Sequence, residues 1–354
     1  MATVSNGDRP LLAAPGLQAA TTRLQALSDR IADPRERRRM VTQGLGAIWR
    51  REHPFRLGDA PAAAPRVIDA VLFCGEWELL EHRVGALAEV TDQTLVVEAD
   101  RTFAGERRAF VLTDAELAAR GWRDRVVARR VTLPDWLNGP QLVETWQRNH
   151  IAVALAGTAG PSDLVLIGDI DELPFPDAIG AAAPQRRALG MRQTRFFGNH
   201  ERVGGAAYQH FGAAIVPVAE FEHATPSEIR EDACHPSPPA WTVVADAGIH
   251  LQYVTAGDAL ADRLGALGHS DDEIEHVLRE RDRVRGGTAL DGYACLVPDC
   301  ALPGDLADVD EDRLDAALEY TIALSDRRSG RRQAPVPDHL GPPADADEEP
   351  VGAG

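Results

Sequence analysis

The sequence contains no lysine, and all 37 of its basic residues are arginine. They are outnumbered by 55 acidic residues, which gives the chain a net charge of −18. Because the phosphate backbone of a nucleic acid requires a basic surface, this balance argues against nucleic acid as a main partner.

Cysteines and long apolar runs are also scarce. The four cysteines are Cys74, Cys234, Cys295 and Cys300. No two of them form a Cys-x-x-Cys pair, so we expect free thiols in a reducing compartment rather than a structural zinc site. No window approaches the roughly 18 apolar residues of a transmembrane helix, and the first residues lack the pattern of a signal peptide. The sequence therefore predicts a soluble, cytoplasmic protein.

Composition divides the 354 residues into three parts. Residues 1–62 predict an N-terminal helical extension and a linker. Seven arginines lie within residues 30–51, which we interpret as a solvated helix face or packing arm rather than a lipid- or partner-binding site. Residues 63–329 predict one large domain. Residues 330–354 are rich in proline, glycine and acidic residues, so we expect them to be disordered.

The domain alternates apolar runs with helical patterns, which predicts an α/β fold with a central mixed sheet flanked by helices. Strands are expected at residues 67–73, 94–97, 126–133, 164–167, 189–197, 213–218 and 249–254. Helices are expected at residues 76–88, 114–120 and 141–156, and two more follow the last strand. Capping boxes predict helix starts after Thr113 and Ser270. In such sheets ligands bind beyond the carboxyl ends of the strands, where Glu98 and Asp169 occur.

The stretch from Asp163 to Pro176 reads DLVLIGDIDELPFP and is the most informative in the chain. Its apolar run predicts a buried strand that ends at an acidic segment and two prolines. Side chains alternate along an extended chain, so Asp169 and Asp171 are predicted to point the same way, ~6.5 Å apart. Two such carboxylates suit one hard divalent cation bound together with a diphosphate.

Other Asp-x-Asp tripeptides are expected in a chain this acidic. They occur at Asp308/Asp310, Asp310/Asp312 and Asp345/Asp347. All of these copies lie in polar loop or tail sequence with no predicted strand before them. The strand context, rather than the tripeptide, singles out the first pair.

Five blocks, in order, resemble those of glycosyltransferase family 17, the β-1,4-mannosyl-glycoprotein 4-β-N-acetylglucosaminyltransferase family. They read RVIDAVLFCGEWELLEHRVGALAEV, QTLVVEADRTFAGERR, ETWQRN, DLVLIGDIDELP and ADAGIHLQYV. The resemblance runs from about residue 66 to residue 287. It implies a GT-A-like nucleotide-sugar-binding fold and an inverting transfer from a UDP-sugar, for which UDP-GlcNAc is the first candidate. It also implies that the transfer depends on a divalent metal, Mn²⁺ or Mg²⁺.

The blocks carry candidate donor-binding residues. Glu98 is expected at the uridine ribose, and Arg83 and Arg148 at the diphosphate, because guanidinium groups bind oxyanions in a bidentate manner. Asp169 is expected to reach the ribose or a metal-bound water. For each arginine the alternative is an internal or surface ion pair, and Glu98 has the same alternative.

The resemblance also implies a metal site. Asp171 is the expected direct ligand, with Asp169 beside it and His250 as a third protein ligand from a distant strand. Mn²⁺ accepts such mixed oxygen and nitrogen coordination. Without the surrounding block, His250 would be interpreted as an ordinary core or surface histidine.

The reaction further requires a general base that takes the proton of the acceptor hydroxyl. Asp246, four residues before His250, is the first choice, and Glu172 is the second. The alternative for Asp246 is a loop carboxylate that caps a turn. No motif dictates the choice.

Three functions are compatible with these features. The first is a cytoplasmic inverting glycosyltransferase whose acceptor is a glycan, a glycolipid or a small molecule. The second is a nucleotidyltransferase, which would require a basic, glycine-rich loop after the first strand; the segment FCGE at residues 73–76 is neither. The third is a non-catalytic nucleotide-sugar or glycan-binding protein that retains the fold. Donor hydrolysis in the presence of Mn²⁺ would separate the first from the third.

Overall fold

The computed structural model describes residues 15–58, 65–197, 208–234, 242–244, 247–252 and 259–285. All of these residues fall within the first of two units, Met1–Gly304. Several sequence predictions lie outside the described residues: the tail at 330–354, Asp246, Cys295 and Cys300.

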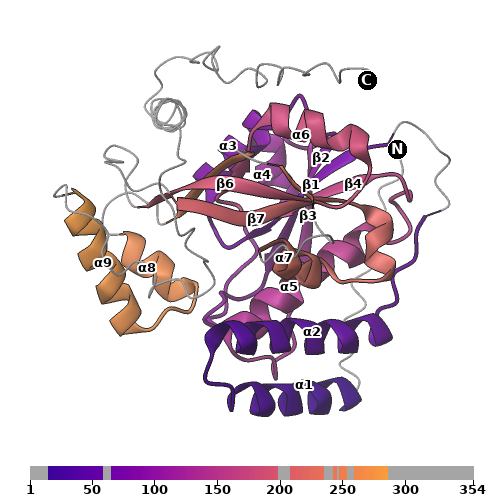
Figure 1. Cartoon of the computed structure of the whole chain (residues 1–354). Coiled ribbons are helices and arrows are strands. Elements are labelled where there is room, and N and C mark those ends of the chain that lie inside the picture. Colours follow the sequence, from indigo (N-terminus) through magenta and orange to yellow (C-terminus); the bar gives the residue numbers. More distant parts are fainter. Residues whose placement is uncertain are drawn as a thin grey trace, which may run out of the picture. The chain divides into compact units, whose positions relative to one another are not determined.

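The strands of the described residues form one mixed sheet (Figure 1). They are β1 (Val67–Phe73), β2 (Gln93–Ala99), β3 (Val126–Val131), β4 (Leu164–Gly168), β5 (Glu172–Pro174), β6 (Leu189–Phe197), β7 (Tyr208–Pro217), β8 (Thr242–Val244) and β9 (Gly248–Gln252). The order is β3-β2-β1-β4-β7-β6-β9-β5, and β8 pairs with β6. Strands β1 to β4 are mutually parallel, whereas β7 runs antiparallel to both β4 and β6.

Helices cover both faces of this sheet (Figure 1). They are α1 (Pro15–Ser28), α2 (Pro34–Glu52), α3 (Trp77–Ala86), α4 (Asp114–Ala119), α5 (Pro140–Leu155), α6 (Pro176–Ala182), α7 (Pro226–Cys234), α8 (Ala259–Ala266) and α9 (Asp271–Arg285), with short 3-10 turns η1 (Ala183–Gln185) and η3 (Val218–Glu222). Helices α5 and α7 pack on one face of the sheet, and α3 and α6 lie on the other. Helix α2 packs on α5 and α7, and α1 packs on α2. The predicted α/β class, with a central mixed sheet flanked by helices, is confirmed.

Strand β4 is buried on both faces, as its uninterrupted apolar sequence predicts. Leu164 and Leu166 belong to the cluster that contains Ile179 of α6. Val165 and Ile167 point the other way, into the larger cluster that contains the apolar residues of α2 and α5. The strand that leads into the acidic segment is therefore fixed from both sides.

The N-terminal helices belong to the same core. Leu45 and Trp49 of α2 are buried, and the Trp49 ring meets that of Trp146 on α5 edge to face at 4.8 Å. The buried His150 ring also contacts Trp49, and burial lowers the pKa of His150 to about 3, so this ring is neutral. Helix α2 thus packs against the core through its apolar side chains.

Most predicted elements begin and end near the expected residues. The strand at 67–73 and the strand at 189–197 match their predicted limits. The side chain of Thr113 accepts a hydrogen bond from the Glu116 amide, and Ser270 and Glu273 cap each other reciprocally. Capping boxes can be predicted from the sequence because they depend on local backbone geometry alone.

The register of the parallel strands places the acidic strand ends at one edge of the sheet. Phe73 of β1 pairs with Glu98 of β2, and Val71 of β1 pairs with Gly168 of β4, the residue before Asp169. Glu98 and Asp169 therefore lie at the carboxyl ends of β2 and β4, which flank β1, and their predicted position at strand ends is observed.

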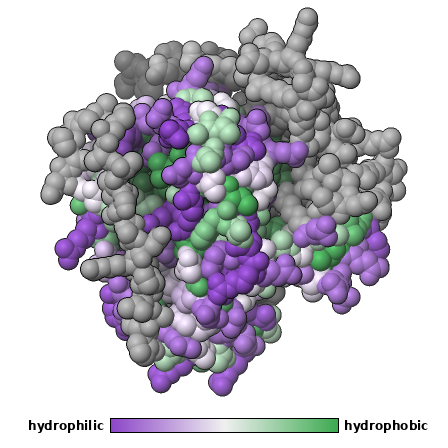
Figure 2. Space-filling model, turned by 180° about the vertical axis from the view of Figure 1, so that it is seen from behind, coloured by the Kyte–Doolittle hydropathy of each residue, from purple (hydrophilic) through white to green (hydrophobic). Residues whose placement is uncertain are grey.

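Polar side chains dominate the described surface on the side shown in Figure 2, with small apolar patches between them. Among the described residues, the exposed large apolar side chains are Leu27, Val111 and Val127. No helix in the described ranges has the length and apolar character that crossing a bilayer would require.

Candidate active site

A tight turn joins β4 to β5 and carries the Asp-x-Asp-Glu sequence. The amide of Glu172 donates to the carbonyl of Asp169 at 3.0 Å, which closes a four-residue turn. In return, the amide of Asp169 donates to Glu172 Oε2 at 2.9 Å. A Cβ on Gly168 would lie 3.1 Å from that same oxygen, so a side chain at this position would crowd the Glu172 carboxylate.

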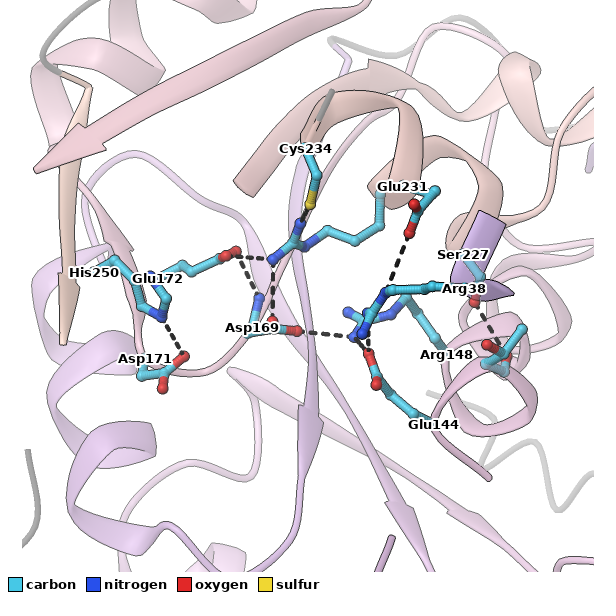
Figure 3. Close-up of polar contacts among 12 residues, drawn as sticks. Arg38, Glu144, Arg148, Asp169, Asp171, Glu172, Ser227, Glu231, Cys234 and His250 are labelled. Atoms are coloured by element: carbon cyan, nitrogen blue, oxygen red, sulfur yellow. Dashed lines mark hydrogen bonds and ion pairs between the residues drawn. The ribbon is translucent and has the colours of Figure 1, made fainter. Parts of the chain in front are cut away.

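The turn corrects the prediction that Asp169 and Asp171 point the same way. That prediction assumed an extended chain, in which side chains repeat every two residues, but the chain reverses here. Asp169 faces Arg148 and Arg230, whereas Asp171 faces His250 (Figure 3). The two aspartates consequently belong to different surroundings.

The surroundings of Asp169 are cationic. Arg148 Nη2 donates to Asp169 Oδ1 at 2.8 Å, and Arg230 Nη2 donates to Asp169 Oδ2 at 3.1 Å. Both arginine side chains are buried, while that of Asp169 is 38% exposed. Burial alone would raise the pKa of Asp169, but Arg148 and Arg230 hold it well below its usual range. Asp169 is therefore a carboxylate at all physiological pH values.

Arg230 was missed by the sequence analysis. It lies on α7, whose sequence PSEIREDAC contains no recognisable motif, and its importance appears only when α7 packs beside the turn. Besides Asp169, it bonds to Glu172 Oε1 and contacts the thiol of Cys234. Burial raises the pKa of Cys234 to about 12, so this thiol stays protonated and is no nucleophile.

Arg83 stabilises the backbone of the turn from within the core. It is fully buried and pairs with the equally buried Asp69 through two hydrogen bonds of 2.8 and 2.7 Å. Its Nη1 donates to the carbonyl oxygens of Asp169 and Glu172. Burial would lower the pKa of Arg83, but Asp69 raises it, so the guanidinium stays charged. The described contacts of Arg83 thus hold the backbone of the turn.

Glu98 likewise binds backbone groups of a neighbouring segment. It is fully buried, and it accepts hydrogen bonds from the amides of Val111 and Leu112 at 2.9 and 3.0 Å. Arg108 Nη2 donates to it at 3.1 Å. Glu98 therefore anchors the loop that follows β2 to the edge of the sheet.

The surroundings of Asp171 result from the pairing of two strands. Strand β5 pairs with β9, so that Glu172 lies opposite His250, and the amide of Leu251 donates to the carbonyl of Asp171 at 2.9 Å. A Cβ on Gly248 would come within 2.3 Å of the carbonyl oxygen of Leu173, so glycine permits this close approach. The register brings His250 Nε2 to 3.6 Å from Asp171 Oδ1. The predicted neighbourhood of these two residues is thus observed.

Asp171 and His250 supply one oxygen and one nitrogen donor. Two ligands of one cation, each about 2.1 Å from it, lie roughly 3.0–3.6 Å apart at angles between 90° and 120°. The observed 3.6 Å fits this range. Among the residues that the structure describes, however, no three His, Cys, Asp or Glu side chains converge as a metal site. The pair therefore fits a cation that takes its remaining ligands from phosphate or water.

The two candidate bases differ in what the structure shows of them. Glu172 is fully buried, and its oxygens accept hydrogen bonds from the Asp169 amide and from Arg230. Asp246 lies outside the described residues.

Comparison with known proteins shows that part of the chain, including the turn, is similar to a recognised family. Residues 51–182 match the family model of glycosyltransferase family 17. The match confirms the resemblance over these residues, and this family 17 segment contains Arg83, Glu98, Arg148 and the whole Asp-x-Asp-Glu turn. Arg230, Asp246 and His250 lie beyond it. The central mixed sheet flanked by helices that the resemblance implied is observed in the structure.

Two solved structures are similar at low identity. A mannosyltransferase from Pyrobaculum calidifontis, in complex with GDP-Man and Mn²⁺, is 13% identical over 88% of this chain and 98% of its own, with a TM-score of 0.32. Glucosyl-3-phosphoglycerate synthase from Mycobacterium tuberculosis, in complex with Mn²⁺, UDP and glucosyl-3-phosphoglycerate, is 12% identical over 71% and 90%, with a TM-score of 0.31. The ligands belong to those two proteins. No curated protein matches the chain.

Proposed function

We propose that this protein is an inverting, metal-dependent glycosyltransferase that transfers a sugar from a UDP-sugar to an acceptor hydroxyl. The first candidate for this sugar is GlcNAc. The observation that carries the proposal is the Asp-x-Asp-Glu turn within the family 17 segment, with Asp171 beside His250. The proposed acceptor is a glycan, a glycolipid or a small molecule.

Asp171 and His250 are the proposed cation ligands. When bound there, Mn²⁺ or Mg²⁺ would act as a Lewis acid that neutralises the charge on the diphosphate leaving group, which is worth several kcal/mol in such reactions. The two side chains are 16% and 9% exposed, so they would hold the cation in a largely protected position.

Arg148 and Arg230 are the proposed contacts of the donor's anionic part. Arg148 Nη1 and Arg230 Nε are buried and have no hydrogen-bond partner among the residues that the structure describes. Each unpaired buried donor costs about 1–3 kcal/mol, and an anionic ligand oxygen would offset that cost where it reaches the nitrogen. Asp169 keeps both guanidinium groups oriented at the edge of the sheet, and in this proposal it also contacts the ribose or a metal-bound water.

Glu98 and Arg83 take positioning roles in this proposal. Both were predicted as donor contacts, but their charged groups hold the 108–112 segment and the turn, respectively. Glu172 is likewise committed to the Asp169 amide and to Arg230, so the base role is assigned to Asp246. In the proposed step the acceptor oxygen attacks the anomeric carbon, its proton moves to the Asp246 carboxylate, and the bond to UDP breaks with the electron pair leaving on UDP.

The test is a screen of nucleotide sugars with and without Mn²⁺. We expect UDP-GlcNAc to raise the melting temperature only when the metal is present, because a ligand that binds the native state stabilises it by mass action. We also expect UDP release, with inversion at the anomeric carbon. Binding without turnover would instead favour a non-catalytic nucleotide-sugar-binding protein. A preference for a guanine nucleotide would overturn the donor assignment.

A further inference from the structure

We propose that Arg38, on the N-terminal helix α2, is a positioning residue for the Asp-x-Asp-Glu turn and acts through Glu144 and Arg148. The proposal rests on the function proposed above and extends the site beyond the family 17 segment, which begins at residue 51. Helix α2 then belongs to the functional machinery as well as to the core.

A continuous series of charged contacts joins Arg38 to the turn (Figure 3). Arg38 Nη2 lies 3.2 Å from Glu144 Oε1 on α5. The same oxygen accepts a hydrogen bond from Arg148 Nη2 at 2.5 Å, and that same nitrogen donates to Asp169 Oδ1 at 2.8 Å. Glu144 Oε1 and Arg148 Nη2 each take part in two consecutive contacts of the series. A displacement of one side chain therefore changes the contact of its neighbour.

Competition for Arg148 Nη2 explains why Arg38 matters. Glu144 and Asp169 both bind this nitrogen, and Arg38 supplies Glu144 with a second cation. Without Arg38, Glu144 would attract Arg148 more strongly and draw it away from Asp169. Burial would raise the pKa of Glu144, but Arg38 and then Arg148 hold it below its usual range, so Glu144 is charged and this competition is electrostatic.

The wider cluster depends on Arg38 for its charge balance. It contains three arginines against four carboxylates: Arg38, Arg148, Arg230, Glu144, Asp169, Glu172 and Glu231. Arg38 also bonds to Glu231 on α7 through its Nε at 3.2 Å, so one guanidinium bridges α5 and α7. Loss of one positive charge from a largely buried group of like-charged carboxylates would loosen the arrangement around the turn.

Helix α2 is a rigid support for this side chain. Val41, Leu45 and Trp49 are all buried in the main core. Next to the cluster, Gln141 Nε2 donates to the carbonyl of Arg38 at 2.7 Å, which fixes the backbone at that position. Arg38 therefore holds Glu144 from a fixed point.

The test compares Arg38→Gln with a matched control, Arg50→Gln. Both arginines lie on α2, their side chains are 35% and 34% exposed, and each pairs with a glutamate of α7. The partner of Arg50 is Glu228, which caps the start of α7 at Thr225 and has no described contact with Asp169. We expect Arg38→Gln to lower kcat/KM for the sugar nucleotide about 10–100-fold, the usual effect of losing a supporting partner. Arg50→Gln should stay within about twofold of the wild type.

A double-mutant cycle tests the route of the effect. In a Glu144→Gln background, Arg38→Gln should add less than about twofold, because the group through which it acts is already neutral. Arg38→Lys should restore part of the activity, since it keeps the charge. Full additivity, or equal effects of Arg38→Gln and Arg50→Gln, would overturn the proposal.

Hydrogen exchange separates this inference from the proposed function. Amides of residues 169–172 should exchange faster in Arg38→Gln than in the wild type and be unchanged in Arg50→Gln, whether or not the protein turns over a sugar nucleotide. Unchanged exchange in Arg38→Gln would overturn the positioning role. Absence of turnover in the wild type would overturn the proposed function alone.

Discussion

Asp169 and Asp171 are separated by one residue, but they face different partners. Asp169 is held between two buried guanidinium groups, on side chains that come from α5 and α7. Asp171 lies beside the imidazole of His250, which β9 brings from a distant part of the sequence. A reversal of the chain at the turn produces this division.

The difference suggests a division of work within one tripeptide. A carboxylate that already neutralises two fixed cations contributes mainly to structure, because its charge is needed where it is. A carboxylate beside an imidazole has an oxygen and a nitrogen donor next to each other, a combination that divalent cations such as Mn²⁺ accept. The predictions below test whether the two aspartates differ in this way.

The largest expected effect is that of Asp171→Asn on activity. The amide keeps the shape of the side chain but removes the charge that would hold the cation, so we expect at least about a hundredfold loss of UDP-sugar turnover. Mn²⁺-dependent UDP binding, measured by calorimetry, should be lost as well, while the fold stays intact. Asp310→Asn, in a tripeptide without a preceding predicted strand, is the control and should change nothing. Normal turnover in Asp171→Asn would place the metal site elsewhere.

Asp169→Asn should have the larger effect on stability. It leaves Arg148 and Arg230 without their shared counter-ion, which costs about 3–5 kcal/mol for a fully buried pair. Because Asp169 is 38% exposed, we reduce this to about 2 kcal/mol. Urea unfolding should show this loss for Asp169→Asn and less than about 1 kcal/mol for Asp171→Asn. The reverse order would contradict the division of work.

His250→Ala should weaken metal dependence without abolishing turnover. The cation would keep its carboxylate and phosphate ligands, so we expect the Mn²⁺ concentration for half-maximal activity to rise about tenfold. Maximal turnover at saturating Mn²⁺ should fall less than in Asp171→Asn. An unchanged Mn²⁺ requirement would remove His250 from the proposed site.

The smallest expected effect is a change in the acid stability profile. The pKa of Asp169 is depressed in the folded protein, so its ion pairs contribute stability that is fully present above its ordinary pKa of about 3.9 and is lost as the pH falls below it. The stability difference between the wild type and Asp169→Asn should therefore be constant down to about pH 5 and shrink below about pH 4. The buried His150 destabilises both proteins equally in acid and cancels in this difference. A constant difference throughout would contradict the assignment.

Much of the fold and part of the site followed from local sequence patterns. The apolar run before Asp169 identified β4, and the position of Glu98 after another such run placed both at one edge of the sheet. The assumption of an extended chain was wrong at Asp171, because the turn is closed by a hydrogen bond between Glu172 and Asp169 that the alternation of side chains does not reveal.

The arginines were harder to interpret. Arg83 and Arg148 were recognised, but whether they bind the donor or protein groups depends on which acceptors the folded chain brings near them. Arg38 and Arg230 received no individual role, since their partners are distant in sequence and no periodic pattern encodes such contacts. Contacts of this kind depend on how α2 and α7 pack, which composition does not determine.

The pairing of β5 has a consequence for the order in which the chain folds. Within the described part of the chain, β5 is three residues long and takes its ladder hydrogen bonds from β9 alone, which lies more than 70 residues later in the sequence. During synthesis at about 5–20 residues per second, β1 to β4 can associate seconds before β9 emerges from the ribosome. Long-range pairing of this kind is also the slow part of folding in general. The acidic turn would then reach its final geometry only at a late stage, after the scaffold that supports it.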